Sequence, residues 1–84
     1  MSGGYHLTEI PKGTFGESSK ILEEVLELRD SEAQGCRLMA LMELADVVGA
    51  VTGYLRKYYP GMTWGDLYCM AEITERAFQT GDRK

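Results

Sequence analysis

Residues 38–55 read LMALMELADVVGAVTGYL, a run of helical length in which Glu43 and Asp46 are the only charged residues. At 100° per residue, one arc of this helix is apolar and both acids point to the other side. The arc consists of Leu41, Leu44, Val48, Val51 and Leu55. The acidic side carries small and apolar residues instead of a solvated polar face, so both sides are expected to be covered. Removing an unpaired carboxylate from water costs several kcal/mol, and the two acids therefore require a cation, most simply a divalent metal ion.

A second amphipathic helix precedes this run. Residues 18–30, SSKILEEVLELRD, place apolar side chains on one arc and Glu23, Glu24 and Glu27 on the polar side. Gly35 separates the two helical runs, and a glycine in such a position typically ends one helix and opens a helical hairpin. The sequence thus predicts two antiparallel helices with a corner at Gly35.

The acids of the two helices are symmetric about Gly35. Glu24 and Asp46 each lie eleven residues from it. Glu27 and Glu43 each lie eight residues from it. With a rise of about 1.5 Å per residue, the members of each pair stand at matching heights, roughly 16 and 12 Å from the turn. Four carboxylates are therefore expected to converge, and an all-oxygen ligand set without His or Cys favours Mg²⁺ or Mn²⁺ over Zn²⁺ and points to phosphate chemistry.

These acids also carry a family resemblance. The segments GESSKILEEVLELRD and ELADVVGA resemble the EExxE and ExxD motifs of the MazG-like, all-α nucleoside triphosphate pyrophosphohydrolases. Short phage and bacterial members are particularly similar, because they share KG, GE and SKI before the acids, a QG corner and a TERAF-then-GxRK ending. The resemblance covers about residues 11–84. It implies a hydrolase that cleaves a nucleoside triphosphate between the α and β phosphates, giving a monophosphate and pyrophosphate with the help of Mg²⁺.

The resemblance also implies roles for individual residues. The metal ligands, which form the catalytic centre, would be Glu24, Glu27, Glu43 and Asp46. Glu23, the first acid of the motif, would be a lesser or outer-shell participant. The substrate-binding cations would be Lys20, Arg76 and Arg83.

Each of these cations has an ordinary alternative. Lys20 lies one turn before Glu24, so an exposed i,i+4 ion pair accounts for it equally well. Arg76, and Arg83 with Lys84, lie in the segment that resembles the family's phosphate-binding part, and a surface charge or a frayed basic tail is the alternative. Tyr54, on the acidic side of its helix, is a candidate for stacking on a base, with core packing as the alternative.

The remaining pattern completes an all-α fold. A third helix is predicted to begin near Thr63, which forms a T-x-x-D capping box with Asp66. Thr14 and Glu17 show the analogous T-x-x-E spacing before the first helix. The third helix is expected to pack on the hairpin through an apolar stripe made of Leu67, Met70, Ala71, Thr74, Ala77 and Phe78.

The N-terminal segment departs from the family's pattern. Larger members carry another helix before the acidic one, whereas residues 1–16 hold four glycines and a proline without helical periodicity. We expect residues 1–15 to form a flexible or extended arm with a solvated His6, followed by a single helical domain over residues 16–84. A chain of 84 residues buries only about 60 to 65% of its unfolded surface, so a homodimer or homotetramer is expected to complete the helical bundle.

Composition limits the other classes of function. The formal net charge is −4, whereas a general nucleic-acid-binding protein needs a basic surface. Glu43 and Asp46 would each cost about 2.5 to 3.5 kcal/mol near a bilayer centre, which argues against a membrane span. No basic and apolar leader opens the sequence, so a cytoplasmic location is expected. Cys36 and Cys69 lack metal-ligand spacing and are expected to be reduced, structural thiols.

Two alternatives to this function stay open at the level of sequence. An enzyme of the same fold could act on phosphoribosyl-ATP, as the related histidine-pathway family does. A non-catalytic helical interaction module could instead use the acids to bind a basic partner or to form ion pairs. A thermal melt with and without Mg²⁺ or Mn²⁺ separates the module from the enzymes, because a metal bound only by the native state raises its melting temperature.

Overall fold

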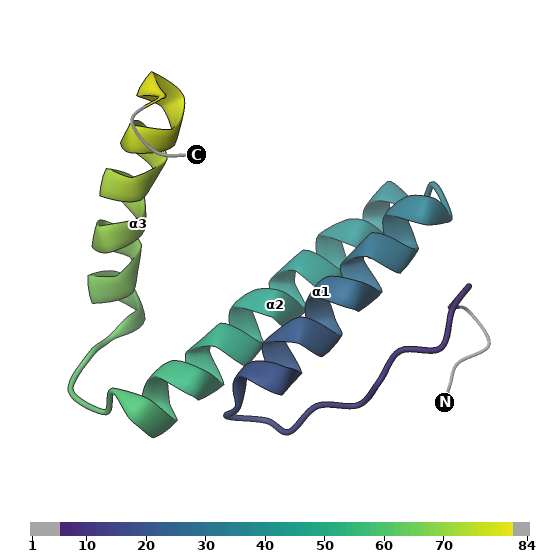
Figure 1. Ribbon diagram of the computed structural model, residues 1–84, viewed down its shortest axis with the longest axis horizontal. Coiled ribbons are helices and arrows are strands. Elements are labelled where there is room, and N and C mark those ends of the chain that lie inside the picture. The colour runs from purple at the N-terminus through teal and green to yellow at the C-terminus, as the bar shows by residue number, and fades with distance from the viewer. Residues whose placement is uncertain (1–5, 82–84) are drawn as a thin grey trace.

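Three α-helices make up the part of the chain that the computed structural model describes, residues 6–81. Helix α1 spans Ser18–Ala33, α2 spans Arg37–Tyr58 and α3 spans Trp64–Thr80. Figure 1 shows α1 and α2 side by side as an antiparallel hairpin, with α3 leading away from it. The predicted all-α fold class and the hairpin are confirmed.

A left-handed glycine forms the corner of the hairpin. The backbone N–H of Gln34 donates to the Asp30 carbonyl, and Gly35 then adopts a φ of 75°, which favours glycine over L side chains. Helix α2 begins directly afterwards, where the Cys36 Sγ accepts a hydrogen bond from the Met39 backbone N–H at 3.5 Å. Gly35 is therefore the corner that the sequence predicts.

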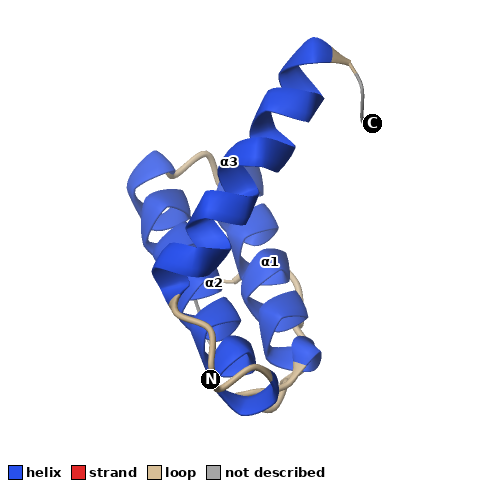
Figure 2. Cartoon of the chain, turned by 90° about the vertical axis from the view of Figure 1, so that its left-hand side faces the viewer, coloured by secondary structure: helices blue, strands red, loops and turns tan. Residues whose placement is uncertain are grey.

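Helix α3 begins with the predicted capping box. The Thr63 hydroxyl accepts a hydrogen bond from the Asp66 N–H at 3.1 Å, and the Asp66 carboxylate accepts one from the Thr63 N–H at 3.0 Å. Figure 2 shows that α3 then extends past the end of the hairpin. The prediction that its apolar stripe packs on the hairpin is wrong, since Met70 and Phe78 remain 56% and 55% exposed. A capping box sets where a helix begins but not the direction in which the preceding turn aims it.

The hairpin buries acids more thoroughly than apolar side chains. Among the described residues, Ala50 and Leu55 are the buried hydrophobic ones. Five polar or charged residues are buried, namely Glu23, Glu24, Asp30, Ser31 and Glu43. Large apolar side chains of α2 stay exposed, including Leu38, Leu41, Met42, Leu44 and Val48. Helix α2 is also long and apolar enough to cross a membrane by length and composition alone. Its apolar surface needs a cover that α1 does not supply.

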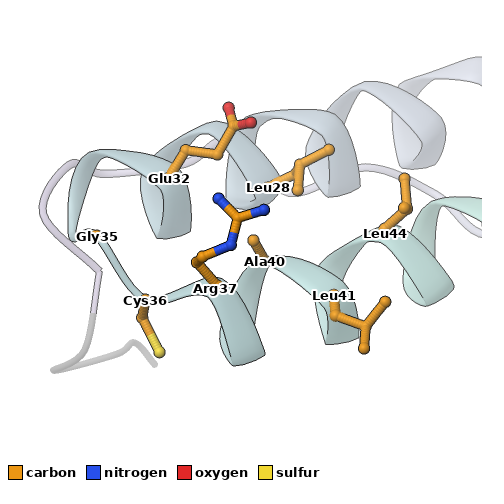
Figure 3. A pocket seen from close by; sticks show the side chains of 8 residues that line it. All are labelled: Leu28, Glu32, Gly35, Cys36, Arg37, Ala40, Leu41 and Leu44. Carbon is orange, nitrogen blue, oxygen red and sulfur yellow. The ribbon is translucent and has the colours of Figure 1, made fainter.

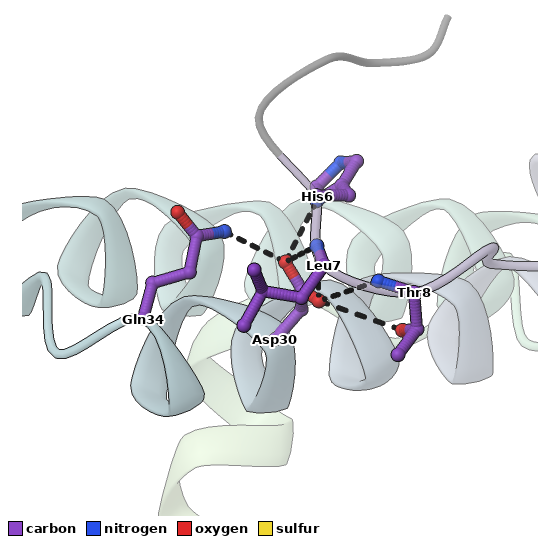
Figure 4. Close-up of polar contacts among 5 residues, drawn as sticks. All are labelled: His6, Leu7, Thr8, Asp30 and Gln34. Carbon is purple, nitrogen blue, oxygen red and sulfur yellow. Dashed lines mark hydrogen bonds and ion pairs between the residues drawn. The ribbon is translucent and has the colours of Figure 1, made fainter.

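Residues 6–17 form an arm that runs along the hairpin before α1 begins (Figure 1). Buried Asp30 anchors the start of the arm, accepting hydrogen bonds from the backbone N–H groups of Leu7 at 2.8 Å and Thr8 at 3.1 Å (Figure 4). Burial pushes the pKa of the Asp30 carboxyl upward, but bonds from Gln34 and the arm hold it below its usual value. The expected solvated His6 is wrong, because its Nδ1 lies 3.2 Å from Asp30 Oδ2.

The base of the arm is tied to the far end of α2. The N-cap of α1 is Glu17, so Thr14 does not cap the helix as the T-x-x-E spacing predicts. The Glu17 carboxylate instead accepts hydrogen bonds from the Lys57 ammonium and, at 2.6 Å, from the Tyr58 hydroxyl. The Glu17 side chain thus makes no cap hydrogen bond to α1 and ties the start of α1 to the end of α2. Lys57 and Arg56 lie in the last turn of α2, where positive charge is favourable.

Candidate metal centre

Acids from both helices of the hairpin meet in one cluster. One carboxylate oxygen each from Glu24 on α1 and from Glu43 and Asp46 on α2 lie within 4.8 Å of one another. A second set with the same spacing comprises Glu23, Glu24 and Glu27 on α1. Antiparallel helices with these residue spacings place the side chains at the same level. The four predicted metal ligands are thus divided between two sets that share Glu24, and a hydrogen bond between Glu27 and Glu43 links the sets.

Two of these acids are buried with an unsatisfied oxygen. Glu24 and Glu43 are 6% and 7% exposed, and the Oε1 atom of each has no hydrogen-bond partner among residues 6–81. A buried acceptor without a partner costs about 1–3 kcal/mol, and more when it is charged. Asp46, in contrast, is exposed and lines an open pocket. A cation bound here would supply the missing partners, so the residues fit a metal ion.

The acids of the cluster perturb one another's protonation. Burial, the negative charge of Glu24 and a hydrogen bond with Glu43 together raise the pKa of Glu27 to about 8. Burial also raises the pKa of Glu43, helped by the charges of Asp46 and Glu24 and opposed by its hydrogen bond with Glu27. At neutral pH Glu27 is therefore mostly protonated in the metal-free protein, which relieves one charge repulsion in the cluster.

Glu23 differs from the other acids because its oxygens are already engaged. It accepts hydrogen bonds from the Gly13 backbone N–H at 2.8 Å and from Lys20 Nζ at 3.2 Å. Lys12 Nζ lies 3.7 Å from its second oxygen. Burial pushes the pKa of Glu23 upward, but the Gly13 N–H and the Lys20 ammonium outweigh it and hold the pKa below its usual value. Glu23 thus holds the arm and Lys20, in keeping with the outer role that the motif implies.

The three predicted substrate-binding cations lie in different places. Lys20 Nζ is 3.0 Å from Glu24 Oε2, so the i,i+4 ion pair is present and the ammonium lies beside the acids. Arg76 is exposed on α3, and the fold of a single chain does not bring it to the cluster (Figure 1). Arg83 lies outside the described residues. Of the two predicted cations among residues 6–81, Lys20 is the one that lies at the site.

An open pocket of about 620 Å³ adjoins the cluster along α2. Glu24, Asp46 and Lys20 belong to its wall. The other lining residues are Phe15, Ala45, Gly49, Ala50, Thr52 and Arg56. Sequence reasoning missed Phe15 and Arg56 as site residues. The available signal was the run of small side chains at Ala45, Gly49 and Ala50, which leaves room beside a helix.

Tyr54, the predicted candidate for stacking on a base, lies in an aromatic cluster instead. Its ring centroid is 4.8 Å from that of Tyr58 and 6.4 Å from that of Tyr59. Such tilted contacts are typical of aromatic packing and favour that alternative. The space beside Gly53, the residue before Tyr54, is filled by the Phe15 ring.

Comparisons with models of known families, with curated proteins and with solved structures found no match to this chain. The geometry of the acids and the motif resemblance are therefore the observations that bear on function. Both concern the same five acids. All five acids lie within the described residues 6–81.

Proposed function

We propose that this protein is a Mg²⁺-dependent nucleoside triphosphate pyrophosphohydrolase, which cleaves its substrate between the α and β phosphates to a monophosphate and pyrophosphate. One observation carries the proposal. Glu24, Glu43 and Asp46 present oxygens within 4.8 Å of one another, and the Oε1 atoms of the first two have no hydrogen-bond partner in the described part of the chain. The EExxE and ExxD resemblance supports the same function, and the adjoining pocket of about 620 Å³ offers room for a substrate.

Four acids would hold the ion, namely Glu24, Glu27, Glu43 and Asp46. Their ligand atoms are all carboxylate oxygens, which suit Mg²⁺, with Mn²⁺ as a substitute. When bound, the ion neutralises phosphate charge and lowers the pKa of a coordinated water. The buried ligands come from two packed helices, so little ordering is needed when the ion arrives.

The protein's own groups would position the substrate and accept the proton. Lys20 lies beside the acids and lines the pocket, where its ammonium is in place to pair with a phosphate oxygen. A carboxylate of the quartet that is not fully engaged would accept the proton of the attacking water at one of its oxygens. Asp46 is the quartet member that is both exposed and part of the pocket wall.

We also propose that the enzyme is a cytoplasmic homodimer or homotetramer. Helices α1 and α2 amount to half of a four-helix bundle, and apolar side chains remain exposed on α2 and α3, among them Met42, Tyr68 and Ile73. A pocket of about 700 Å³ at the hairpin corner is also lined by apolar residues, including Leu28, Ala40, Leu41 and Leu44 (Figure 3). A second copy would cover these surfaces. A bilayer is a poor cover, because α2 carries Glu43 and packs against the charged α1.

One observation favours a second candidate function. The exposed apolar face of α3 would also suit a non-catalytic interaction module, in which the acids serve only as ion-pair partners. Such a module should melt at the same temperature with and without Mg²⁺ or Mn²⁺, whereas the enzyme should not. An enzyme acting on phosphoribosyl-ATP differs from the proposed one only in substrate, so this compound belongs in the substrate panel.

The deciding experiment is a product analysis. The purified protein is incubated with each dNTP, each NTP and phosphoribosyl-ATP in the presence of Mg²⁺, and the products are separated by ion-exchange chromatography. We expect monophosphate and pyrophosphate, not diphosphate and inorganic phosphate. Chelation with EDTA should stop the reaction.

Two variants tie the activity to the cluster. Glu24→Gln and Asp46→Asn should lose most of it, since each removes one proposed ligand. Glu72→Gln is the matched control, because it neutralises an exposed acid on α3. Inactivity of the wild type on the whole panel, or full activity of both ligand variants, would count against the proposal.

A further inference from the structure

Phe15 is an exposed aromatic residue with a fixed position. Its side chain is 64% exposed, yet the ring packs directly on Gly53 of α2. A Cβ atom at position 53 would lie only 2.5 Å from Phe15 Cζ and 2.7 Å from Cε1. The ring meets α2 through its outer edge, Cζ with Cε1 and Cε2, and can lie there only because residue 53 is glycine, while most of the residue stays open to solvent.

The arm is fastened on both sides of Phe15. On one side, the Gly13 N–H donates to Glu23 at 2.8 Å, and the Thr14 N–H donates to the Ser19 hydroxyl at 3.0 Å. On the other side, the Glu17 carboxylate binds Lys57 and Tyr58. These contacts hold the backbone on both sides of Phe15, although leaving a large apolar ring exposed to water is unfavourable. This arrangement indicates a surface that is kept ready for a flat apolar group.

The pocket beside Phe15 combines three kinds of recognition. Its wall includes the acids Glu24 and Asp46, the cations Lys20 and Arg56, and the Phe15 ring. Gly53 follows Asp46 by seven residues along α2, which separates the ring from the acids by about 10 Å along the helix axis. A ligand that fits this order has a metal-binding anionic group at one end and a flat aromatic group at the other. A nucleotide has that form, with its sugar spanning the distance between.

We propose that Phe15 is the platform on which the base of the bound nucleotide stacks. This inference rests on the proposed function, since it concerns the same pocket. Stacking on an aromatic side chain is tolerant of base identity because every base has a π-face. The arm therefore supplies general affinity for nucleotides, and Glu23 contributes by fastening the arm through Gly13.

Isothermal titration calorimetry with three probes tests the proposal. The probes are α,β-imido-dATP and α,β-imido-dCTP, which resist cleavage, and tripolyphosphate, which lacks sugar and base, each with Mn²⁺ present. Phe15→Leu should weaken binding of both nucleotide analogues by about 5- to 100-fold, the equivalent of one lost base stack. It should leave the affinity for tripolyphosphate unchanged. Phe15→Trp should retain the affinity of the wild type.

Two further variants complete the test. Gly53→Ala should displace the ring and reproduce the loss, whereas Phe78→Leu, at an exposed phenylalanine of α3, should change neither affinity. The proposal is overturned when Phe15→Leu binds the analogues as tightly as the wild type, or loses tripolyphosphate to the same extent. If the wild type hydrolyses nucleotides while Phe15→Leu binds them equally well, this inference fails alone. If the wild type hydrolyses none but binds the analogues through Phe15, only the proposed function fails.

Discussion

Replacing Glu43 by Gln is expected to change stability in opposite directions without and with metal. In the metal-free protein Glu43 is 7% exposed, its Oε1 finds no hydrogen-bond partner among the described residues, and burial and the nearby charges raise its pKa. Gln keeps the shape, removes the charge and offers N–H donors to the neighbouring Glu24. The metal-free variant should therefore be more stable than the wild type. With metal present, the same substitution removes a ligand, so the order should reverse.

The size of both effects follows from the local geometry. Relief of one unpartnered buried acceptor is worth about 1–3 kcal/mol, and because Gln keeps one amide oxygen the lower end, about 1 kcal/mol, applies. A metal ion at 100 times its dissociation constant stabilises the native state by about 2.7 kcal/mol. In a domain of 84 residues, each kcal/mol shifts the melting temperature by roughly 4–8 °C. Without metal, the melting temperature of the variant should thus be about 4–8 °C above that of the wild type. Metal should raise the melting temperature of the wild type by about 10–20 °C.

Thermal melts followed by circular dichroism measure both quantities. Each protein is melted at one fixed concentration, first in EDTA and then across a series of Mn²⁺ and Mg²⁺ concentrations. Glu72→Gln, which loses an exposed charge on α3, serves as the control and should behave as the wild type. The reasoning is refuted if metal raises the melting temperature of Glu43→Gln as far as that of the wild type. A metal-free variant that melts below the wild type would refute it equally.

Three further predictions concern the anchor of the N-terminal arm, the protonation of Glu27 and the exposed apolar surface of α2. Asp30→Asn weakens the anchor of the Leu7 and Thr8 N–H groups, so limited proteolysis should cut the arm sooner and the melting temperature should fall. The pKa of Glu27 is raised from 4.5 to about 8 in the folded protein, so its contribution to stability is complete below about pH 4.5 and lost as the pH rises through about 8. The melting temperature of the metal-free protein should fall across that window, and Glu27→Gln should flatten the fall. Leu41→Lys, on the exposed face of α2, should reduce the assembly to smaller species in size-exclusion chromatography with light scattering, and a wild type that is already monomeric at micromolar concentration would contradict the proposed oligomer.

The helical hairpin and the matching heights of the acids on its two helices follow from local rules. Helical periodicity places Glu24 and Asp46 on their helices, and one glycine in the left-handed region closes the corner at Gly35. Because the rise per residue is constant, equal spacing from the corner gives equal height without any information on tertiary contacts. The corner depends on residues that are neighbours in the sequence, and the height of each acid depends on the constant rise per residue along a single helix. The sequence therefore predicts both.

The arm and the direction of α3 depend on contacts that no local rule contains. Phe15 rests on Gly53, and Leu7 on Asp30, across separations of more than twenty residues. Asp30 looks like an ordinary surface acid of an amphipathic helix until the arm supplies its donors. The apolar stripe of α3 predicts packing on the hairpin, but the stripe holds no information on where the preceding turn directs the helix, and Met70 and Phe78 stay exposed.

The charge of the cluster gives the strongest physical argument that the acids serve a ligand. Five acids lie in the two metal-sized sets, and Lys12 and Lys20 are the cations paired with them among residues 6–81. Burial and neighbouring charge raise the pKa of Glu27 to about 8, so Glu27 is mostly protonated at neutral pH, and the other four acids still outnumber the two paired lysines. A hairpin selected only for stability would place apolar side chains at Glu24 and Glu43, since a buried ion pair rarely outweighs well-packed hydrophobic residues. Buried acids that destabilise the fold are expected where a sequence serves function at the cost of stability. In this chain they are the same acids that the motif contains.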